Sequence, residues 1–301
     1  MAAITVVINS KNSADHIESC LESVQFADEI LLADMQSTDE TLAIAKQFPV
    51  KIVSVPLSSH VELIRNQVIE QATSPWVLLL DADERVPKTL ATKLLVLADS
   101  DQEDPAIYSI ARKNIIFSEW LRHSGWWPDY QVRFFTKGAV SWSPKIHQPP
   151  ETSCDPVELP AEERLAIEHH NYRSLSEFLS KMDRYTTIEA EQKAGANSTK
   201  LSSDRLLQEY FSEFFRRYYQ AEGWKDGLHG LTLTLLQSQY QSLVLLKDWE
   251  KQGFSKQKQP LSAALVGQVI SEWRYWQAAQ MVAQSTGISK IYWLLRKKFR
   301  W

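Results

Sequence analysis

The stretch that decides the fold is Trp76-Val77-Leu78-Leu79-Leu80-Asp81-Ala82-Asp83-Glu84. Its first five residues are apolar, and Pro75 and Pro87 bracket it, which is the pattern of a buried strand in a parallel sheet. The apolar run ends in three carboxylates. Because ligands of open α/β sheets bind beyond the carboxyl ends of the strands, this strand end is a candidate functional site.

The paired carboxylates Asp81 and Asp83 predict a metal site. Residues two apart in an extended backbone point the same way. A hard divalent cation such as Mg²⁺ or Mn²⁺ prefers oxygen ligands, keeps several waters and also binds substrate phosphates. The alternative is a polar turn between strand and helix, in which Asp83 or Glu84 caps the helix that follows.

Apolar runs alternate with helical periodicity over the first 85 residues. This β-α-β alternation implies a parallel sheet that is covered by helices and joined by right-handed crossovers. The second helix is expected to begin after Ser37 or Thr38, either of which can cap it. The expected strands are 4–8, 29–34, 51–55 and 76–81, and the expected helices are 17–24, 39–48 and 61–72.

Three of these strands end in polar clusters, at residues 9–12, at Asp34, and at Asp81 with Asp83. The carboxyl ends of parallel strands lie on one edge of a sheet, so the clusters are expected to share one crevice. The chain has no Gly-x-Gly-x-x-Gly motif and no Walker-type glycine loop, which argues against a dinucleotide dehydrogenase or a P-loop enzyme.

The second half of the chain changes character. Residues 117–142 are dense with aromatic side chains, and residues 151–163 read as an acidic, proline-containing loop. From residue 174 onward the pattern is helical. We therefore predict an α/β domain over residues 1–172 and a helical extension over residues 173–301.

Composition excludes several classes of protein. The net charge of −4 and the pI near 6.0 argue against a general nucleic-acid binder. Cys20 and Cys154 form no Cys-x-x-Cys pattern, so we expect reduced thiols in a cytosolic protein and no zinc framework. We expect neither a signal peptide nor a membrane span, because no charged region precedes the first strand and no apolar run reaches about 18 residues.

The C-terminal tail, residues 291–301, is basic and aromatic. Such a helix suits a membrane surface with anionic lipid headgroups, where tryptophan sits at the interface. The alternative is a helix end packed on the rest of the protein, with its basic residues favoured near the helix C-terminus.

Six segments, in the same order along the chain, resemble motifs of the family 2 glycosyltransferases, whose fold is of the GT-A type. Two later segments, 214–218 and 223–227, are similar to the C-terminal part of the lipopolysaccharide-core glucosyltransferase branch of that family. The six segments are 4–12, 29–41, 64–66, 80–84, 128–133 and 146–147.

The resemblance implies a Rossmann-like α/β fold, with a mostly parallel sheet, helices on both faces and a C-terminal helical extension. It also implies an inverting, metal-dependent transfer of a sugar to an acceptor hydroxyl, with UDP-glucose as the expected donor. The acceptor would be a glycan or lipid-linked molecule of the cell envelope or lipopolysaccharide, with the enzyme in the cytoplasm or peripheral on the inner face of the cytoplasmic membrane.

Two other functions stay open on the residues alone. One is a nucleotide-sugar-binding scaffold without catalysis, although the presence together of Asp34, Asp81, Asp83 and Asp129 argues against a decayed site. The other is a nucleotidyltransferase, which usually has a glycine-rich basic loop after its first strand. Residues 9–13 contain no glycine.

For the donor, the resemblance assigns the nucleoside to Ser10, Asn12 and Asp34. Arg65 would reach the base or a phosphate oxygen, to which a guanidinium can donate two hydrogen bonds. Asp83 would be the direct ligand of Mg²⁺ or Mn²⁺, and Asp81 would touch the ribose or a metal-bound water. The metal would neutralise the charge that develops on the leaving nucleoside diphosphate.

For the acceptor, Asp129 is the candidate general base, and desolvation by the neighbouring aromatic side chains is expected to raise its pKa. Arg133 would pair with the diphosphate or hold Asp129. Trp126 and Trp127 would stack on sugar faces, or else belong to a packed loop. His147 is the expected third metal ligand, and its competitors are His169 and His170.

Overall fold

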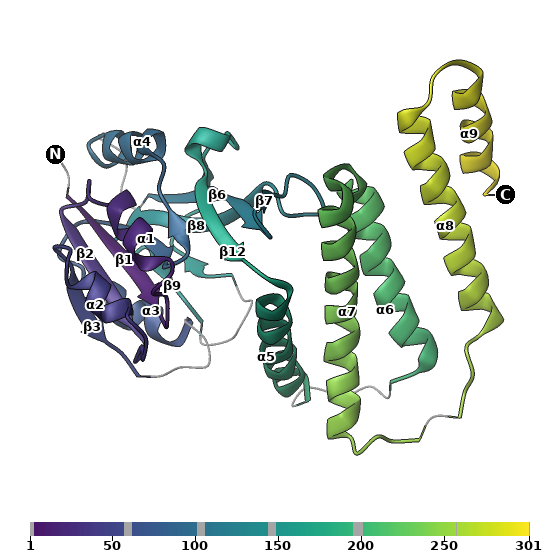
Figure 1. Cartoon of the computed structure of the whole chain (residues 1–301), viewed down its shortest axis with the longest axis horizontal. Coiled ribbons are helices and arrows are strands. Elements are labelled where there is room, and N and C mark those ends of the chain that lie inside the picture. Colours follow the sequence, from purple (N-terminus) through teal and green to yellow (C-terminus); the bar gives the residue numbers. More distant parts are fainter. Residues whose placement is uncertain are drawn as a thin grey trace. The chain divides into compact units, whose positions relative to one another are not determined.

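The computed structural model describes residues 3–56, 62–100, 106–143, 149–194, 201–256 and 258–300. The chain divides into two compact units (Figure 1). The first comprises residues 1–120 and 127–171, and the second comprises residues 121–126 and 172–301. The short segment 121–126, which we predicted within the α/β domain, is therefore part of the helical unit.

The first half of the α/β unit has the predicted alternation. Its four strands are parallel and lie in the order β3-β2-β1-β4. The strands are β1 (Ile4–Ser10), β2 (Glu29–Asp34), β3 (Lys51–Ser54) and β4 (Trp76–Asp81), and the helices are α1 (Ile17–Ser23), α2 (Thr41–Ala45) and α3 (Glu62–Ile69).

Helix α2 begins at Thr41, so the expected cap at Ser37 or Thr38 is wrong. Side chains hold the loop before it in a non-helical conformation. The Thr38 N–H donates to the Asn12 side-chain oxygen at 2.8 Å, and the Thr41 N–H donates to Asp39 at 3.1 Å. The loop after β2 is thereby tied to the loop after β1.

The sheet continues beyond β4 with antiparallel strands, so the whole sheet is mixed. Its order is β4-β8-β6-β12-β5, and β7 and β11 also pair with β6. The new elements are β5 (Glu84–Arg85), α4 (Lys88–Ala98), β6 (Ile107–Ile116), β7 (Glu119–Trp120), β8 (Asp129–Thr136), β11 (Val157–Glu158), a 3-10 turn (Glu163–Leu165), β12 (Ile167–Tyr172) and the separate pair β9 (Val140–Ser141) and β10 (Glu151–Thr152).

Both faces of this sheet are covered, as the fold prediction requires. Alternate residues of a strand point to opposite faces, and β4 contributes Leu78 and Leu80 to one apolar cluster and Val77 and Leu79 to another. The first cluster contains residues of α1, α2 and α4, and the second contains residues of α3. The polar ends of β1, β2 and β4 are thus positioned by strands that are almost wholly buried.

The second unit is helical, as expected from residue 174 onward (Figure 1). The loop 121–126 is bound within it, because the Ser124 N–H donates to the Ala221 carbonyl at 2.7 Å and Ser124 is fully buried. No described helix is long and apolar enough to cross a membrane. The helices are α5 (Leu175–Ala194), α6 (Ser203–Phe215), a π-helical turn (Arg216–Gln220), a 3-10 turn (Gly223–Asp226), α7 (Gly227–Lys251), α8 (Ala263–Gln284) and α9 (Gly287–Phe299).

Candidate active site

The polar ends of the three parallel strands meet at one edge of the sheet. Strand β1 lies between β2 and β4, and its register places Ser10 opposite Asp34 and Asn9 opposite Asp81. Asn9, Ser10 and Asp34 are each at most 3% exposed. The predicted convergence of these clusters is therefore confirmed.

Two polar atoms at this edge have no hydrogen-bond partner among the described residues. They are the side-chain oxygens of Asn9 and Ser10. The Asn9 amide nitrogen is engaged, because it donates to Asp81 at 3.2 Å and to the Leu80 carbonyl at 3.4 Å. Buried polar atoms without a partner cost stability, so this edge is suited to a ligand that supplies hydrogen-bond donors.

Asp34 and Asn12 shape the neighbouring loops. Both Asp34 carboxylate oxygens accept from the Ser37 N–H, at 3.3 and 3.2 Å. Asn12 is exposed, and its side-chain oxygen accepts from the Thr38 N–H. Its backbone lies in the left-handed region at φ 47°, which asparagine tolerates better than most residues. Asn12 therefore positions the loop after β2, and its predicted contact with a base stays a prediction.

Asp81 is neutralised by arginines. Arg133 donates to its Oδ2 atom at 3.0 Å, and the Arg65 guanidinium lies 3.5 Å from its Oδ1 atom. Burial by itself would raise the pKa of Asp81, but the charges of Arg133 and Arg65 outweigh it and hold this pKa well below its ordinary value. Asp81 is thus an ionised carboxylate whose charge is already compensated.

Glu84 anchors the turn after β4. It is fully buried, accepts from Arg133 at 2.6 Å and lies 3.5 Å from Arg112. It also accepts from the Asp81 N–H at 3.0 Å. The alternative that Glu84 caps the next helix is wrong, because α4 has Pro87 as its N-cap residue and no side-chain cap.

Arg133 is 3% exposed and is held by Asp81 and Glu84. The prediction that it holds Asp129 is wrong, because another arginine, Arg112, has that role. Its contact with a diphosphate stays a prediction, for which the Nε atom, unpartnered among the described residues, is the available donor.

Asp129 accepts several hydrogen bonds. Arg112 donates to Oδ2 through Nε at 2.9 Å and through NH2 at 2.6 Å, and Asn114 donates to the same oxygen at 3.0 Å. Gln131 donates to Oδ1 at 2.9 Å. Burial would raise the pKa of Asp129, but the Arg112 charge and these hydrogen bonds outweigh it and lower the pKa. The expected rise in this pKa is therefore wrong.

Of the three histidines considered, His147 lies outside the described residues. His169 lies beside the Asp-x-Asp turn, because β12 pairs with β5 and places it opposite Glu84. Its Nδ1 atom is 2.8 Å from the Asn114 side-chain oxygen, and its Nε2 atom is 3.6 Å from Asp83 Oδ2. His170 donates its N–H to the Asp83 carbonyl at 2.9 Å. Burial, helped by the charge of Arg85, lowers the pKa of the His170 ring to about 4, so this imidazole is neutral at pH 7.

The hydrogen bonds of Asn114 determine which nitrogen of His169 carries the proton. The Asn114 amide nitrogen donates to Asp129, so its oxygen accepts from Nδ1–H of His169. In the neutral imidazole, Nε2 then presents a lone pair near the Asp83 carboxylate. Two electron-pair donors side by side are the chemistry of a cation site, in which a second hydrogen bond orients the histidine.

This pair does not by itself make a complete metal shell. The described residues hold no group of three or more histidine, cysteine or acidic side chains that can bind one metal ion. A Mg²⁺ or Mn²⁺ ion at Asp83 would thus take further ligands from substrate phosphates and water, as such ions usually do. The residues present therefore fit Mg²⁺ or Mn²⁺, provided that substrate phosphates and water supply the remaining ligands.

The two tryptophans predicted at the acceptor belong to different units. Trp127 packs edge-on against Trp120, with ring centres 5.3 Å apart. Within the helical unit, the Arg217 guanidinium lies 5.6 Å from the ring centre of Trp126. Both rings therefore have packing roles of the kind expected for a packed loop, and their stacking on sugars stays a prediction.

Sequence reasoning missed four residues of this cluster as site residues: Glu84, Arg112, Asn114 and, as a first choice, His169. A signal for two of them exists. Arg112 and Asn114 lie two apart in the strand 107–116, so they share one face of that strand. For His169, by contrast, only the pairing of two distant strands brings it near Asp83.

Several known proteins are similar to this chain in sequence. Residues 5–152 match the family model described as Glycosyl transferase family 2. A Rickettsia felis protein described as an uncharacterized glycosyltransferase is 26% identical over 241 residues, which cover 75% of this chain and 83% of that protein. The lipopolysaccharide core biosynthesis glycosyltransferase LpsC of Rhizobium meliloti is 23% identical over 252 residues, which cover 80% of this chain and 89% of that protein.

A solved structure of S. aureus TarS 1–349 in complex with UDP is 14% identical to this chain. The alignment covers 87% of this chain and 94% of that chain, with a TM-score of 0.42. This similarity is too distant to support an argument about function.

The matched segment, residues 5–152, contains the strand-end residues Asn9, Ser10, Asp34, Asp81 and Asp83. It also contains the four parallel strands that position them. Through this segment the chain belongs to glycosyl transferase family 2, and the protein is a glycosyltransferase with a GT-A-like fold.

Proposed function

We propose that this enzyme is an inverting, metal-dependent glycosyltransferase that transfers a sugar from a nucleoside diphosphate donor to a hydroxyl of a cell-envelope glycan. One observation carries the proposal. Buried polar atoms without partners among the described residues lie at the same sheet edge as Asp81 and Asp83. The lipopolysaccharide-related name of one relative supports the acceptor class, and UDP-glucose is the donor we expect from the resemblance to the glucosyltransferase branch.

The nucleoside would bind at the ends of β1 and β2. The buried oxygens of Asn9 and Ser10 can accept hydrogen bonds from ribose hydroxyls or from the N–H groups of a base. Asp34, opposite Ser10, adds a carboxylate that can accept as well. A ligand that donates to these atoms would remove the cost of leaving them unpaired.

The metal would bind at Asp83. Asp81 is compensated by two arginines, and the Asp83 carboxylate lies 3.6 Å from the Nε2 atom of His169. Mg²⁺ or Mn²⁺ bound there would act as a Lewis acid that stabilises the leaving diphosphate. The Arg65 Nε atom, which has no partner among the described residues, can donate to a phosphate oxygen.

The acceptor hydroxyl would transfer its proton to Asp129. This carboxylate is ionised at neutral pH, because its pKa is lowered by Arg112 and by its hydrogen bonds. A lowered pKa makes it a weaker base than the one we predicted, since proton transfer is most efficient when the pKa lies near the working pH. Arg112 would keep the Asp129 carboxylate ionised, and Asp129 would accept the proton of the acceptor hydroxyl.

The test is thermal stabilisation of the whole protein by UDP, GDP, CDP and ADP, each with and without Mn²⁺. A ligand that binds only the folded state raises the melting temperature by mass action, so about 100 times its Kd adds about 2.7 kcal/mol. We expect one diphosphate, UDP first, to stabilise the protein only with metal. Asp83→Asn should abolish this effect.

Asp155→Asn is the matched control, because Asp155 is an exposed aspartate in the loop between β10 and β11. It should keep the full stabilisation. Stabilisation by no diphosphate under any condition would refute the donor site. Metal-dependent binding without hydrolysis or transfer of the matching nucleotide sugar would instead support the scaffold alternative.

A second comparison distinguishes His169 from His147 as the histidine ligand. His169→Gln should raise the Mn²⁺ concentration needed for diphosphate binding by 10- to 100-fold, the usual range for a ligand or its support. If His147→Gln has that effect and His169→Gln has none, the assignment of the third ligand returns to His147.

A further inference from the structure

Helix α9 is an amphipathic helix whose apolar face is exposed. Five apolar residues recur at the spacing i, i+3, i+4, i+7 and i+11, which places them on one side of a helix. None of the described residues of α9 is buried. The exposed fractions of these five side chains are 87% for Ile288, 58% for Ile291, 45% for Tyr292, 46% for Leu295 and 64% for Phe299.

Positive charge flanks this apolar face. On a helix of 3.6 residues per turn, Arg296 and Lys298 lie about 80° to either side of the centre of the face. The last turn of α9 contains Arg296, Lys297 and Lys298, and Arg300 follows it. With Lys290, residues 287–300 carry five positive charges and no acid, although the whole chain has a net charge of −4.

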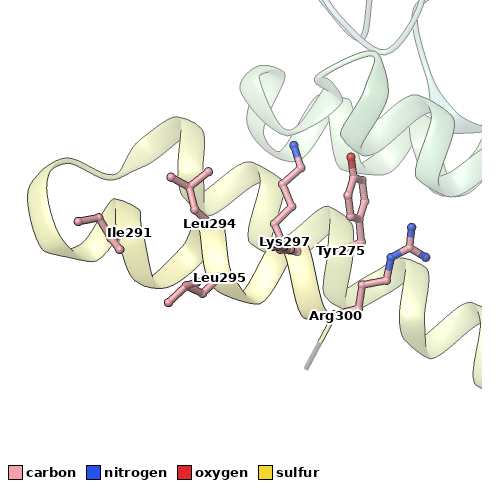
Figure 2. Close-up of a pocket in the computed structure, with 7 residues that line it drawn as sticks. Tyr275, Ile291, Leu294, Leu295, Lys297 and Arg300 are labelled. Atoms are coloured by element: carbon pink, nitrogen blue, oxygen red, sulfur yellow. The ribbon is translucent and has the colours of Figure 1, made fainter.

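The partner helix α8 does not cover the apolar face. Tyr275 of α8 contacts the basic side of α9, with Lys297 Nζ 5.2 Å and the Arg300 guanidinium 4.9 Å from its ring centre (Figure 2). A groove of about 580 Å³ runs along this contact, lined by apolar side chains of α9 and by its basic residues (Figure 2). The lining residues are Tyr275, Ile291, Leu294, Leu295, Lys297, Lys298 and Arg300.

We propose that helix α9, supported by α8, binds the surface of an anionic lipid bilayer. The apolar face would enter the boundary between headgroups and acyl chains, and the flanking cations would contact lipid phosphates. A groove with apolar walls and a basic rim has the chemistry of that boundary. The inference is independent of the donor site, because all of these residues lie in the helical unit.

Charge argues against a second copy of this chain as the occupant. A symmetric dimer through the apolar face would bring two helices, each with five positive charges and no acid, against each other. Like charges at such an interface are costly. An anionic lipid surface instead complements both the apolar face and the charge.

The test is cosedimentation of the whole protein with vesicles of phosphatidylcholine, alone or mixed with phosphatidylglycerol. We expect binding to the mixed vesicles that weakens in high salt, because salt screens exposed charges. Arg296→Gln with Lys298→Gln should weaken binding about 25-fold, at roughly fivefold for each cation. Ile291→Ser with Leu295→Ser should weaken it about tenfold or more.

Two matched controls remove basic or apolar side chains that lie outside α9. Lys256→Gln with Lys258→Gln removes two exposed lysines between α7 and α8, and Leu228→Ser with Leu235→Ser removes two exposed leucines of α7. Both should bind like the unchanged protein. The proposal is overturned if the unchanged protein ignores anionic vesicles, or if the α9 variants bind as it does. It is also overturned if the controls lose as much binding as the α9 variants.

Self-association is measured on the same protein samples by size-exclusion chromatography. If size-exclusion chromatography shows a dimer that the Ile291→Ser, Leu295→Ser variant dissociates, and vesicles bind neither form, the apolar face is a contact between copies. Wild-type-like melting and circular dichroism of each variant establish that lost binding is not lost folding. Diphosphate stabilisation should be unchanged in all four variants, which separates this proposal from the donor site.

Discussion

At the scale of single residues, the two aspartates of the Asp-x-Asp turn differ in their surroundings. Asp81 is paired with Arg133 and Arg65, so it adds little net negative charge at this edge of the sheet. Asp83 lies near the imidazole of His169 and is about a quarter exposed. Asp83 stays our predicted metal ligand, because its carboxylate lies 3.6 Å from an imidazole nitrogen that can also bind a cation.

The Arg112–Asp129 pair gives a testable prediction on stability. Arg112→Met leaves Asp129 partly buried without its countercharge. We expect the free energy of unfolding to fall by roughly 2–4 kcal/mol. This value is at the lower end for a broken buried ion pair, because about a fifth of each side chain is exposed. Urea unfolding at pH 7 measures this loss. Asp129→Asn combined with Arg112→Met should lose less than the sum of the two single changes.

The same pair predicts a pH dependence. The folded-state pKa of Asp129 is lowered, so its contribution to stability is complete above the unfolded-state pKa, about 3.9. That contribution is lost as pH falls through the lower, folded-state pKa. The stability difference between the unchanged protein and Arg112→Met should therefore shrink below about pH 4. A difference that stays constant down to pH 3 would show that Arg112 acts through packing alone.

At the scale of elements, close packing in the helical unit depends on one glycine. Gly230 lies in the first turns of α7, where a Cβ atom would overlap the Gly223 carbonyl oxygen. The two nearest atoms belong to the backbone of Gly223, so they cannot move as a flexible side chain can. Gly223, whose carbonyl makes this close contact, belongs to the segment 223–227 that resembles the family in sequence.

We predict that Gly230→Ala destabilises the protein by about 2–3 kcal/mol, because overpacking forces the backbone apart. Gly267→Ala is the matched control. Gly267 is an exposed glycine within α8, with no atom within 4 Å of an added Cβ. Alanine at this position should raise the free energy of unfolding by about 1 kcal/mol, since glycine is a poor helix former. Thermal melts of both variants test these opposite signs.

At the scale of the whole molecule, the chain passes between its two units more than once. The segment 121–126 leaves the α/β unit and is held within the helical unit. Ser124 accepts from Arg217 at 2.8 Å through its carbonyl, and the His123 N–H donates to Asp226 at 2.8 Å. Leu121 is only 1% exposed. A boundary drawn at one point near residue 172 therefore separates this segment from its partners.

This arrangement predicts how a fragment of residues 1–172 behaves. It should keep metal-dependent diphosphate binding, because the polar residues at the strand ends belong to the α/β unit. Its segment 121–126 should exchange backbone hydrogens at least tenfold faster than in the whole protein, since buried hydrogen bonds are lost. Hydrogen exchange measured by mass spectrometry tests this, and slow exchange in the fragment would contradict it.

The sequence by itself determined the parallel half of the sheet and the edge where the site lies. Apolar runs such as 76–80 are strands because they can be buried on both faces, and the polar residues after them must then lie at one edge. That inference needs only local periodicity and the parallel order of the strands. The helical character of the second half follows from periodicity in the same way.

Only the tertiary structure decided the electrostatics of the site. Arg112, Asn114 and His169 reach Asp83 and Asp129 through strand pairings between segments far apart in the chain. The pKa of Asp129 is lowered because an arginine, rather than aromatic rings alone, became its neighbour. Which charged residues become neighbours depends on which distant strands form hydrogen bonds with each other. Local sequence patterns do not predict which distant strands pair.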